Sequence, residues 1–370
     1  MSLLFLTADE LGSWTGGSTV ASQECLALKE FADQSVRQRR DATLSSVKVL
    51  SRRELGSTLE EPWKWDEVAL KRLDETATIP RLCHVYSGTF SKTIKWLKEQ
   101  GTKVTWTIAA HDVAISKREH EKLGLPFPYL HLTEKALWKR YISGYAMADV
   151  IICPGLEPAG VVRRYGEEFL QKRIEIIPHG CHLPEEIKPL PKTFVVGYCG
   201  AICGGDKGVR YLLEAWKRLN YTDGSLLVIA GKDSVSPWTR HLLNTYGGGS
   251  VHLAGWQKDM SDFYNSISLF VCPAATEGFN LEVVESLAHG RSVLCSKNAG
   301  AADLTPEGWR VPACDVDALV DRIRMARNAV ESSYSFDWQG SWKERAVDYT
   351  WEKVRGMYKS LWTEVLYGKE

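Results

Sequence analysis

Short apolar segments alternate with helical patterns along almost the whole chain, and this alternation restricts the folds that the sequence can form. In the first half, apolar residues spaced three and four apart, as on one face of a helix, occur in Lys92–Gln100 and Glu134–Met147. Strands joined through helices pair in parallel, and the helices then cover both faces of the sheet. The first half is therefore predicted to be one α/β domain. Its predicted strands, after an opening strand within residues 1–10, are Val47–Leu50, Leu82–Tyr86, Val104–Ala109, Val150–Cys153 and Ile174–Ile177.

A segment rich in proline and in charges of both signs, residues 183–193, interrupts the alternation and predicts an interdomain linker. The alternation then starts again, with a helical pattern over Gly208–Leu219. We expect a second α/β domain, and two such domains in series leave a cleft between them as the natural ligand site. The predicted strands of this domain are Phe194–Cys199, Leu226–Ala230, Val251–Leu253, Leu269–Cys272 and Val293–Ser296.

The last part of the chain is predicted to be helical and is rich in aromatic residues. Helical patterns cover Asp317–Glu331 and Ser341–Leu366. The final helix is amphipathic, so it can bury its apolar face by packing back on the first domain. The predicted organisation is a Rossmann-like domain over residues 1–182, the linker over 183–193, a second Rossmann-like domain over 194–340, and a helix over 341–370 that crosses back to the first domain.

Composition narrows the functions that need to be considered. Lys plus Arg total 46, as do Asp plus Glu, so the chain has no overall basic field that would recruit nucleic acid. The nine cysteines lack paired spacing, which favours a reducing compartment over a disulfide framework. No apolar run has the length of a transmembrane helix, and residues 1–10 lack the positive start of a signal peptide. These features predict a cytoplasmic protein.

The segment Glu277–Glu285 is the strongest candidate for a ligand site. It follows the predicted buried strand Leu269–Cys272 and leads into a predicted helix. In open α/β sheets, ligands bind beyond the carboxyl ends of the strands, and the free N–H groups of a first helical turn suit a phosphate. Gly278 allows close approach of the backbone, and the carboxylates of Glu277 and Glu285 can accept hydrogen bonds from sugar or ribose hydroxyls.

Each predicted domain also has a glycine-rich segment after its first strand. In the first domain, Gly16 and Gly17 belong to a predicted turn ahead of a helix over 19–32, and such glycines serve either a ligand or the turn alone. In the second domain, the segment contains Gly200 and ends in Lys207 at the start of a helix. This loop can hold a diphosphate with backbone N–H groups and one cation, although it lacks the P-loop sequence.

His111 directly follows a predicted strand of the first domain, Val104–Ala109. At the cleft it could bond a substrate hydroxyl or phosphate, or act as an acid or base. The next residue, Asp112, is predicted to be the N-cap of the following helix. A histidine at the end of a strand is more often structural, so the case for His111 depends on the motifs across the cleft.

Taken in order along the chain, these motifs resemble the retaining nucleotide-sugar glycosyltransferases of the GT-B fold. That large family includes sucrose synthases and bacterial mannosyl- and glucosyltransferases. The likeness covers most of the chain and is strongest from Phe194 to Asp303. It implies two Rossmann-like domains that face each other across a cleft. The motifs that carry it are Gly16-Gly17, His111-Asp112, Ile176-Ile177-Pro178-His179-Gly180, Gly200 with Lys207-Gly208, and Glu277-Gly278-Phe279 with Glu285.

The resemblance also implies a role for each matching residue. Glu277 would contact hydroxyls of the donor sugar, and Glu285 would hold the ribose hydroxyls. Lys207 would neutralise the diphosphate leaving group, and His111 would contact the sugar near its primary hydroxyl. His111, Lys207 and Glu277 are thus the implied catalytic residues. The implied donor site includes Lys207, Glu285, Gly16, Gly17, Gly200, Gly278, Phe279, Asn280 and Leu281.

The resemblance implies no metal ion and no cofactor besides the nucleoside-diphosphate sugar, with a UDP-sugar favoured, because helix N-termini and cations take over the role of a metal. The chain departs from the family pattern at two places. Similar proteins often carry an arginine six residues before the lysine, and Ala201 stands there. Arg210 or Lys232 could supply the missing phosphate contact. The usual Pro-Asn-Gly is replaced by Pro178-His179-Gly180, which we interpret as variation of a turn.

The resulting hypothesis is a retaining, metal-independent hexosyltransferase that acts on a hydroxyl of a saccharide, lipid or protein glycan. The first alternative is transfer to a hydroxylated base of DNA, and further alternatives are a nucleotide-sugar-binding protein without catalysis and a nucleotide-sugar epimerase. The sequence does not indicate the oligomeric state, and peripheral contact with a membrane stays open. A local basic face, which would favour DNA, could be formed by Lys92, Lys95, Lys98, Lys103, Lys117 and Arg118.

Overall fold

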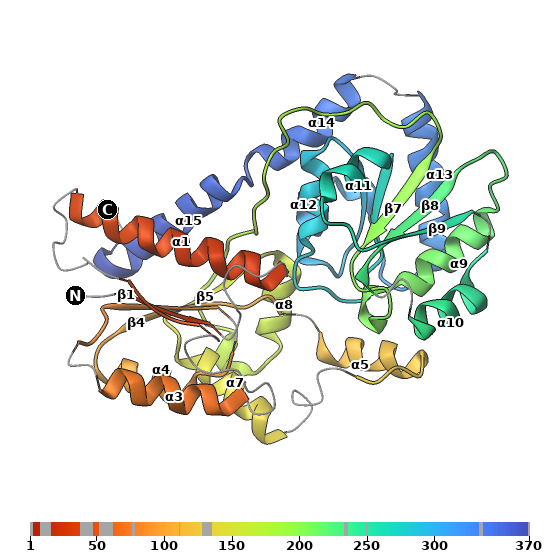
Figure 1. The fold of residues 1–370 in the computed structure, drawn as a ribbon. Helices are drawn as coiled ribbons and strands as arrows, with labels where there is room; N and C mark the ends of the chain where they lie inside the picture. Colours follow the sequence, from red (N-terminus) through yellow and green to blue (C-terminus); the bar gives the residue numbers. More distant parts are fainter. Residues whose placement is uncertain are drawn as a thin grey trace.

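The computed structural model describes most of the chain, namely residues 3–7, 16–37, 47–51, 62–75, 78–86, 88–110, 112–127, 135–232, 236–248, 250–332 and 336–368. Within these residues, the strands form two parallel sheets of six strands each, with helices on both faces of each sheet (Figure 1). The prediction of two Rossmann-like domains is confirmed.

The first sheet has the strand order β2-β1-β3-β4-β5-β6. Its strands are β1 (Leu3–Thr7), β2 (Val47–Leu50), β3 (Leu82–Tyr86), β4 (Lys103–Thr107), β5 (Val150–Cys153) and β6 (Ile174–Ile176). Its helices are α1 (Gly16–Arg37), α3 (Pro62–Asp74), α4 (Ser91–Glu99), α5 (Val113–Lys122), α7 (Lys135–Met147), α8 (Leu156–Arg163) and the short η1 (Glu167–Phe169).

All five residues of β1 are buried because helices cover both faces of this sheet. Leu4 and Leu6 point into the core cluster shared with α3 and α4. Leu3 and Phe5 point the opposite way, into the cluster shared with α1 and the C-terminal helix α15 (Trp351–Tyr367). Figure 1 shows the same division, with α1 and α15 above the sheet and α3, α4 and α7 below it.

The second sheet has the order β12-β11-β10-β7-β8-β9. Its strands are β7 (Val195–Cys199), β8 (Leu226–Ala230), β9 (Val251–Gly255), β10 (Leu269–Cys272), β11 (Ser292–Ser296) and β12 (Arg310–Val311). Its helices are α9 (Val209–Leu219), α10 (Pro237–Tyr246), α11 (Met260–Ser266), α12 (Leu281–Ala288), α13 (Val316–Ser332), and the short η2 (Gly205–Lys207), η4 (Gly300–Leu304) and η5 (Glu307–Trp309).

The strand order reverses next to β7. The chain runs outward from β7 through β8 to β9, and then returns to place β10 on the other side of β7. At such a switch point the loops after the two central strands separate and leave a crevice beyond their carboxyl ends. Two loops border this crevice. The loop after β7 leads to Lys207, and the loop after β10 contains Glu277.

The C-terminal segment differs from its prediction as one helix over Ser341–Leu366. The structure has two helices, α14 (Phe336–Val347) and α15, and Thr350 caps the second one by accepting a hydrogen bond from the N–H of Lys353. The break is needed because α14 packs on α12 of the second domain, whereas α15 packs beside α1 of the first (Figure 1). The prediction that the last helix returns to the first domain is confirmed.

A buried polar network joins α15 to the first domain. The Tyr358 hydroxyl donates to one oxygen of Glu24 at 2.5 Å, and His84 lies 2.7 Å from the other oxygen. Trp362 donates its indole N–H to Thr105 at 3.1 Å. Since each of these polar groups has a partner, the helix can be buried without leaving orphaned donors or acceptors.

The first helix also begins earlier than predicted. α1 starts at Gly16, so Gly16 and Gly17 form its first turn and do not lie in a turn ahead of it. Glycine has a low intrinsic helix propensity, but α1 buries one face against the sheet and α15, from Val20 to Phe31. Tertiary burial of this kind outweighs propensity.

Helix α5 belongs to the first half of the chain but packs on the second domain, below α9 and α10 in Figure 1. The carboxylate of Glu119 is buried there and accepts a hydrogen bond from the Tyr211 hydroxyl at 2.6 Å. The N–H of Gly205, in η2, donates to the ring of His120 at 3.3 Å. The loop that leads to Lys207 is therefore held by a helix of the opposite half.

Glycines allow the two domains to touch through their backbones. A Cβ on Gly278 would lie 2.6 Å from the carbonyl oxygen of Ala109, and one on Gly155 would lie 2.0 Å from that of Gly300. Real Cβ atoms do not come this close to a backbone oxygen. The first residue after Gly155, Leu156, donates its N–H to Asp303 at 3.1 Å across the same junction.

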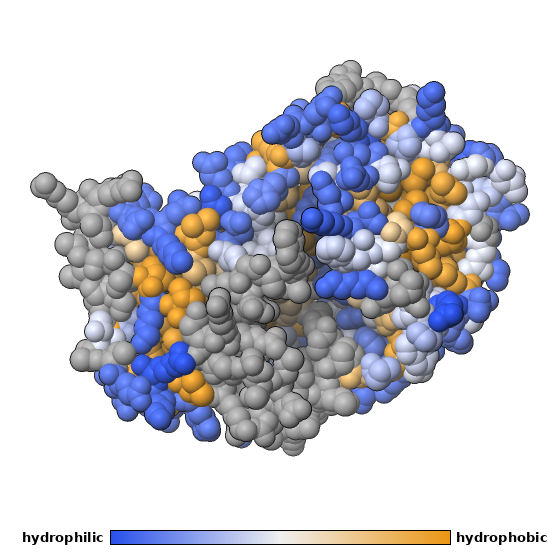
Figure 2. All heavy atoms as spheres, viewed as in Figure 1, coloured by the Kyte–Doolittle hydropathy of each residue, from blue (hydrophilic) through white to orange (hydrophobic). Residues whose placement is uncertain are grey.

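No helix among the described residues is long and apolar enough to span a membrane. On the face shown in Figure 2, hydrophilic side chains break up the apolar ones over both domains.

We predict that Gly205→Ala destabilises the protein by about 1–3 kcal/mol, because the added Cβ would overpack the backbone of α5. That Cβ would lie 2.6 Å from the backbone nitrogen of His120. Gly308→Ala is the matched control, since Gly308 also lies in a short 3-10 helix and a Cβ there would meet nothing within 4 Å. Equal unfolding free energies of the two variants in urea would contradict the tight contact between α5 and η2.

Candidate functional site

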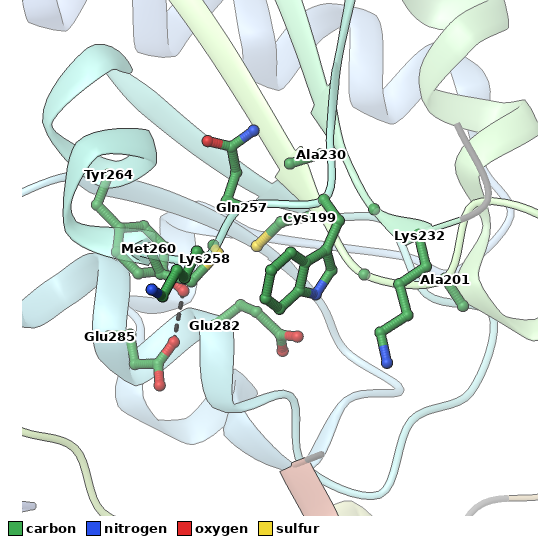
Figure 3. Close-up of a pocket in the computed structure, with 13 residues that line it drawn as sticks. Cys199, Ala201, Ala230, Lys232, Gln257, Lys258, Met260, Tyr264, Glu282 and Glu285 are labelled. Atoms are coloured by element: carbon green, nitrogen blue, oxygen red, sulfur yellow. Dashed lines mark hydrogen bonds between the residues drawn. The ribbon is translucent and has the colours of Figure 1, made fainter. Parts of the chain in front are cut away.

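Two neighbouring cavities lie at the switch point of the second sheet. The larger has a volume of about 540 Å³ and is formed by the strand ends of β7, β8 and β9 together with α11 and α12 (Figure 3). The smaller, of about 320 Å³, lies between the domains and includes Val20, Tyr86 and Ala109 of the first. Among the described residues, Glu282 is the one that lines both cavities. The two spaces therefore meet at the first turn of α12.

An ion pair between Lys207 and Glu277 occupies the wall of the smaller cavity. Burial alone would lower the pKa of Lys207, but the negative charges of Glu277 and Asp206 hold it well above its usual value. Lys207 is thus a permanent cation. The next residue, Gly208, has a positive φ of 71°, and a Cβ on it would lie 2.0 Å from the carbonyl oxygen of Pro273. Only glycine lets the loops after β7 and β10 close together and align this pair.

The loop from Glu277 to Asn280 is fixed on both sides. The N–H of Glu277 donates to the carbonyl of Asn298 at 3.0 Å, and its carbonyl accepts from Gly300 at 3.2 Å. Asn280 adopts φ 81° and does not cap α12 with its side chain. Since the Asn280 side chain takes none of the first N–H groups of α12, this helix N-terminus is a candidate site for an anion.

Glu285 lies one turn further along α12 and lines the larger cavity. One of its oxygens accepts a hydrogen bond from the Tyr264 hydroxyl at 2.5 Å (Figure 3). Burial raises the pKa of Glu285 to about 7, although the bond from Tyr264 acts in the opposite direction. Burial also raises the pKa of Glu282. Both carboxyl groups of the larger cavity therefore have pKa values above the usual one.

Most residues singled out by the sequence lie around these cavities. Gly200 borders the larger one, and the smaller one is lined by Lys207, Glu277, Gly278, Phe279, Asn280 and Leu281. Gly16 and Gly17 stand one helical turn before Val20, which lines the smaller cavity. His111 lies outside the described residues. Its neighbour Asp112 is the N-cap of α5, as predicted, and accepts hydrogen bonds from Ala114 and Ile115.

Several cavity residues were missed by the sequence reasoning. His179 was interpreted as turn variation, yet it is buried, lines the smaller cavity and packs edge-on against Phe279 at 4.9 Å between ring centroids. Burial lowers its pKa to about 3, so the ring is neutral. Glu282 lies inside the motif that was recognised, but its side chain had no assigned role. The segment after β9, which contributes Trp256, Gln257 and Lys258, carries no motif that could have identified it.

Of the two candidates to replace the arginine absent at Ala201, Arg210 does not reach the site. Its guanidinium donates to Glu119 at 3.4 Å and lies over the ring of Tyr211. Lys232 borders the larger cavity together with Ala201 (Figure 3).

The chain resembles known proteins in both sequence and structure. Residues 193–328 match the model of the family described as Glycosyl transferases group 1. The chain is 27% identical over 167 residues to the lipopolysaccharide 1,2-N-acetylglucosaminetransferase of Salmonella typhimurium. That alignment covers 39% of this chain and 44% of the relative, so the chain matches less than half of that protein's length.

Solved structures share the whole architecture. Sucrose-phosphate synthase from Thermosynechococcus elongatus superposes with a TM-score of 0.74, at 16% identity and with 100% of both chains covered. HepE of Anabaena, solved in complex with UDP-glucose, superposes with a TM-score of 0.64, at 14% identity, covering 98% of this chain and 100% of that one. At such identities the likeness establishes the fold, which is GT-B.

The raised pKa of Glu285 predicts a pH-dependent effect on stability. Folding raises this pKa from 4.5 to about 7, so the carboxyl favours the folded state below pH 4.5 and loses that contribution as the pH rises through 7. The full loss is about 3 kcal/mol. Glu285→Gln keeps an acceptor for Tyr264 and has no charge to bury. The variant should therefore gain stability over the wild type between pH 5 and pH 8.

The measurement is urea unfolding at both pH values. Glu99→Gln serves as the control because this side chain, at the end of α4, is 58% exposed. A constant difference between Glu285→Gln and the wild type at pH 5 and pH 8 would contradict the raised pKa.

Proposed function

We propose that this chain is a retaining glycosyltransferase that moves a hexose from a nucleoside-diphosphate sugar to an acceptor hydroxyl. The match of residues 193–328 to the model of the Glycosyl transferases group 1 supports this proposal. The observation that carries the proposal is the pair of cavities that meet at the first turn of α12, with the Lys207–Glu277 ion pair beside it. A nucleoside-diphosphate sugar has three parts in line. The nucleoside would fit the larger cavity, the diphosphate the anion site at the first turn of α12, and the sugar the smaller cavity.

In this proposal the nucleoside occupies the larger cavity. Glu285 receives a ribose hydroxyl on the oxygen that Tyr264 does not use, since the hydrogen bond from Tyr264 is made to Oε2. UDP is the favoured nucleotide, because HepE, which has the same fold, was solved with UDP-glucose. The diphosphate then passes Glu282 to reach the N–H groups at the start of α12, whose dipole favours negative charge.

The sugar occupies the smaller cavity between the domains. Glu277 and the neutral His179 offer hydrogen-bonding groups to its hydroxyls, and His111 is proposed to contact its primary hydroxyl. As the bond from the anomeric carbon to the phosphate oxygen breaks, negative charge develops on the diphosphate. Lys207 and the N-terminus of α12 stabilise that charge without a metal ion, since both are in place beforehand.

No protein nucleophile is required in this mechanism. The acceptor hydroxyl approaches on the face from which the phosphate departs, and the departing phosphate oxygen takes the hydroxyl proton as the new glycosidic bond forms. The configuration at the anomeric carbon is therefore retained. The shielded cavity between the domains protects the oxocarbenium-like sugar from water.

We propose a saccharide, lipid or protein glycan as the acceptor rather than a base of DNA. Five of the six cations that would have formed a basic face, all except Lys103, pair with acidic neighbours. Lys92 pairs with Glu67 at 2.7 Å, and Lys98 pairs with Asp149 at 2.6 Å. Further ion pairs join Lys95 to Glu99, Lys117 to Glu121 and Arg118 to Glu119.

The test is transfer or slow donor hydrolysis over a panel of UDP-, GDP- and ADP-hexoses, with the anomeric configuration of the product read by NMR. Lys207→Ala should lower kcat by about 100-fold or more, because a preorganised charge at the leaving group is lost. Glu285→Ala should mainly raise the donor KM. Lys95→Ala, at an exposed ion pair of α4, is the control.

A wild-type kcat in Lys207→Ala together with a wild-type donor KM in Glu285→Ala would refute the assignment. Nucleotide binding without any turnover would identify a binding protein, and an altered sugar released without an acceptor would identify an epimerase.

A further inference from the structure

We infer that Lys232 binds the diphosphate of the nucleotide, as a second cation beside the glycine-rich loop that lacks one at Ala201. This inference rests on the proposed function, and it assigns to the site a residue that belongs to none of the motifs on which the family resemblance rests. Four observations carry it: the position of Lys232, the balance of charge around the cavities, the commitment of the other cations, and the freedom of its ammonium group.

The position of Lys232 follows from the pairing of β7 with β8. These strands are parallel and end in register, with Cys199 opposite Ala230. Their backbones stay in contact beyond the sheet, because a Cβ on Gly231 would lie 2.2 Å from the carbonyl oxygen of Gly200. The residues after these two glycines are Ala201 and Lys232. A long basic side chain thus stands next to the position where the glycine-rich loop has only a methyl group.

The described residues that line the two cavities include as many acidic as basic side chains. The described lining residues include three carboxylates, Glu277, Glu282 and Glu285, and three lysines, Lys207, Lys232 and Lys258. Lys207 is already paired with Glu277. Glu282, which borders both cavities, would repel a diphosphate that passes it whenever its carboxyl group is ionised. A second cation on the opposite wall would offset this repulsion and bind the phosphate oxygens.

The other cations near the glycine-rich loop and the larger cavity are less suitable. Arg210 is held by Glu119 and Tyr211. Lys258 lies near Tyr264 and Glu285, away from Ala201 and Lys232 in Figure 3, at the part of the cavity assigned to the ribose. Lys232 instead borders the larger cavity beside the glycine-rich loop, and Glu282 lines both this cavity and the smaller one assigned to the sugar.

Lys232 itself is uncommitted. It makes no hydrogen bond or ion pair with the described residues, and its exposed side chain projects from the end of β8 beside the cavity (Figure 3). A lysine ammonium on a flexible stem can donate three hydrogen bonds and can follow a phosphate group as it shifts. Phosphate recognition therefore requires no rearrangement of other side chains.

The experiment compares a nucleoside with its diphosphate, so that binding to the phosphates is separated from binding to the base and ribose. The dissociation constants of UDP, GDP and ADP are measured by calorimetry, and the tightest ligand is then compared with its own nucleoside. In Lys232→Ala, the affinity for the diphosphate should fall about 10- to 100-fold, as expected for hydrogen bonds to a charged group. The affinity for the nucleoside should change less than about twofold.

Two further variants test the specificity of the effect. Lys232→Arg, which keeps the charge, should restore most of the diphosphate affinity. Lys258→Ala, the matched lysine of the same cavity, should leave the ratio of nucleoside to diphosphate affinity close to that of the wild type. Equal diphosphate binding by Lys232→Ala and the wild type, or an equal loss for nucleoside and diphosphate, would overturn the inference.

A double variant distinguishes direct binding from simple screening of Glu282. If Lys232 binds the diphosphate, replacing it by Ala in a Glu282→Gln protein should still weaken the diphosphate at least about 10-fold. If the loss disappears in that background, Lys232 only neutralises Glu282 and the inference is wrong. Failure of the wild type to bind any of the three nucleoside diphosphates would instead refute the proposed function, and this inference with it.

Discussion

Direct contact between the backbones of the two domains is the constraint on which the rest of this structure depends. Gly278 packs against Ala109, and Gly300 packs against both Gly155 and the carbonyl of Gly278. A side chain at any of these glycines would push the domains apart and enlarge the smaller cavity, whose walls come from both domains. The glycine inside the Glu277–Glu285 motif was expected to admit a ligand to the backbone. In the structure, the absence of a side chain at Gly278 lets the backbone of Ala109 in the first domain pack against it.

Around this junction, neighbouring residues fix the charge and orientation of the site's ionisable side chains before any ligand binds. Lys207 remains a cation because Glu277 and Asp206 offset the cost of its burial. Glu285 tends toward its neutral form because it is buried, and Tyr264 orients it. An anion that reaches the N-terminus of α12 therefore meets a fixed cation and preset dipoles. Little reorganisation is needed when charge moves onto a leaving group.

Local patterns in the sequence predicted the strands well. They did not predict where a helical segment is divided by packing against two different domains. β2, β3, β5, β8 and β10 have the predicted bounds, since a continuous apolar run between turns has few other uses. The division of the C-terminal segment into α14 and α15 was missed because both halves have helical periodicity. The two helices separate ahead of the N-cap Thr350 because α14 packs on α12 of the second domain and α15 packs on α1 of the first. His179 was undervalued for a similar reason, because its burial against Phe279 depends on a contact between the domains.

By itself, the sequence determined the fold class, the presence of two sheets, the return of the last helix and the residues of the central motif. Each of these follows from periodicity, glycine placement or residue chemistry over a few adjacent positions. The tertiary structure decided which groups meet. Lys207 pairs with Glu277, Arg210 is committed to Glu119, and Lys232 has no such partner among the described residues. Glu282 stands between two cavities. These partners come from loops far apart in the chain. The reversal of strand order next to β7 brings most of them together, and spacing along the sequence carries no record of that reversal.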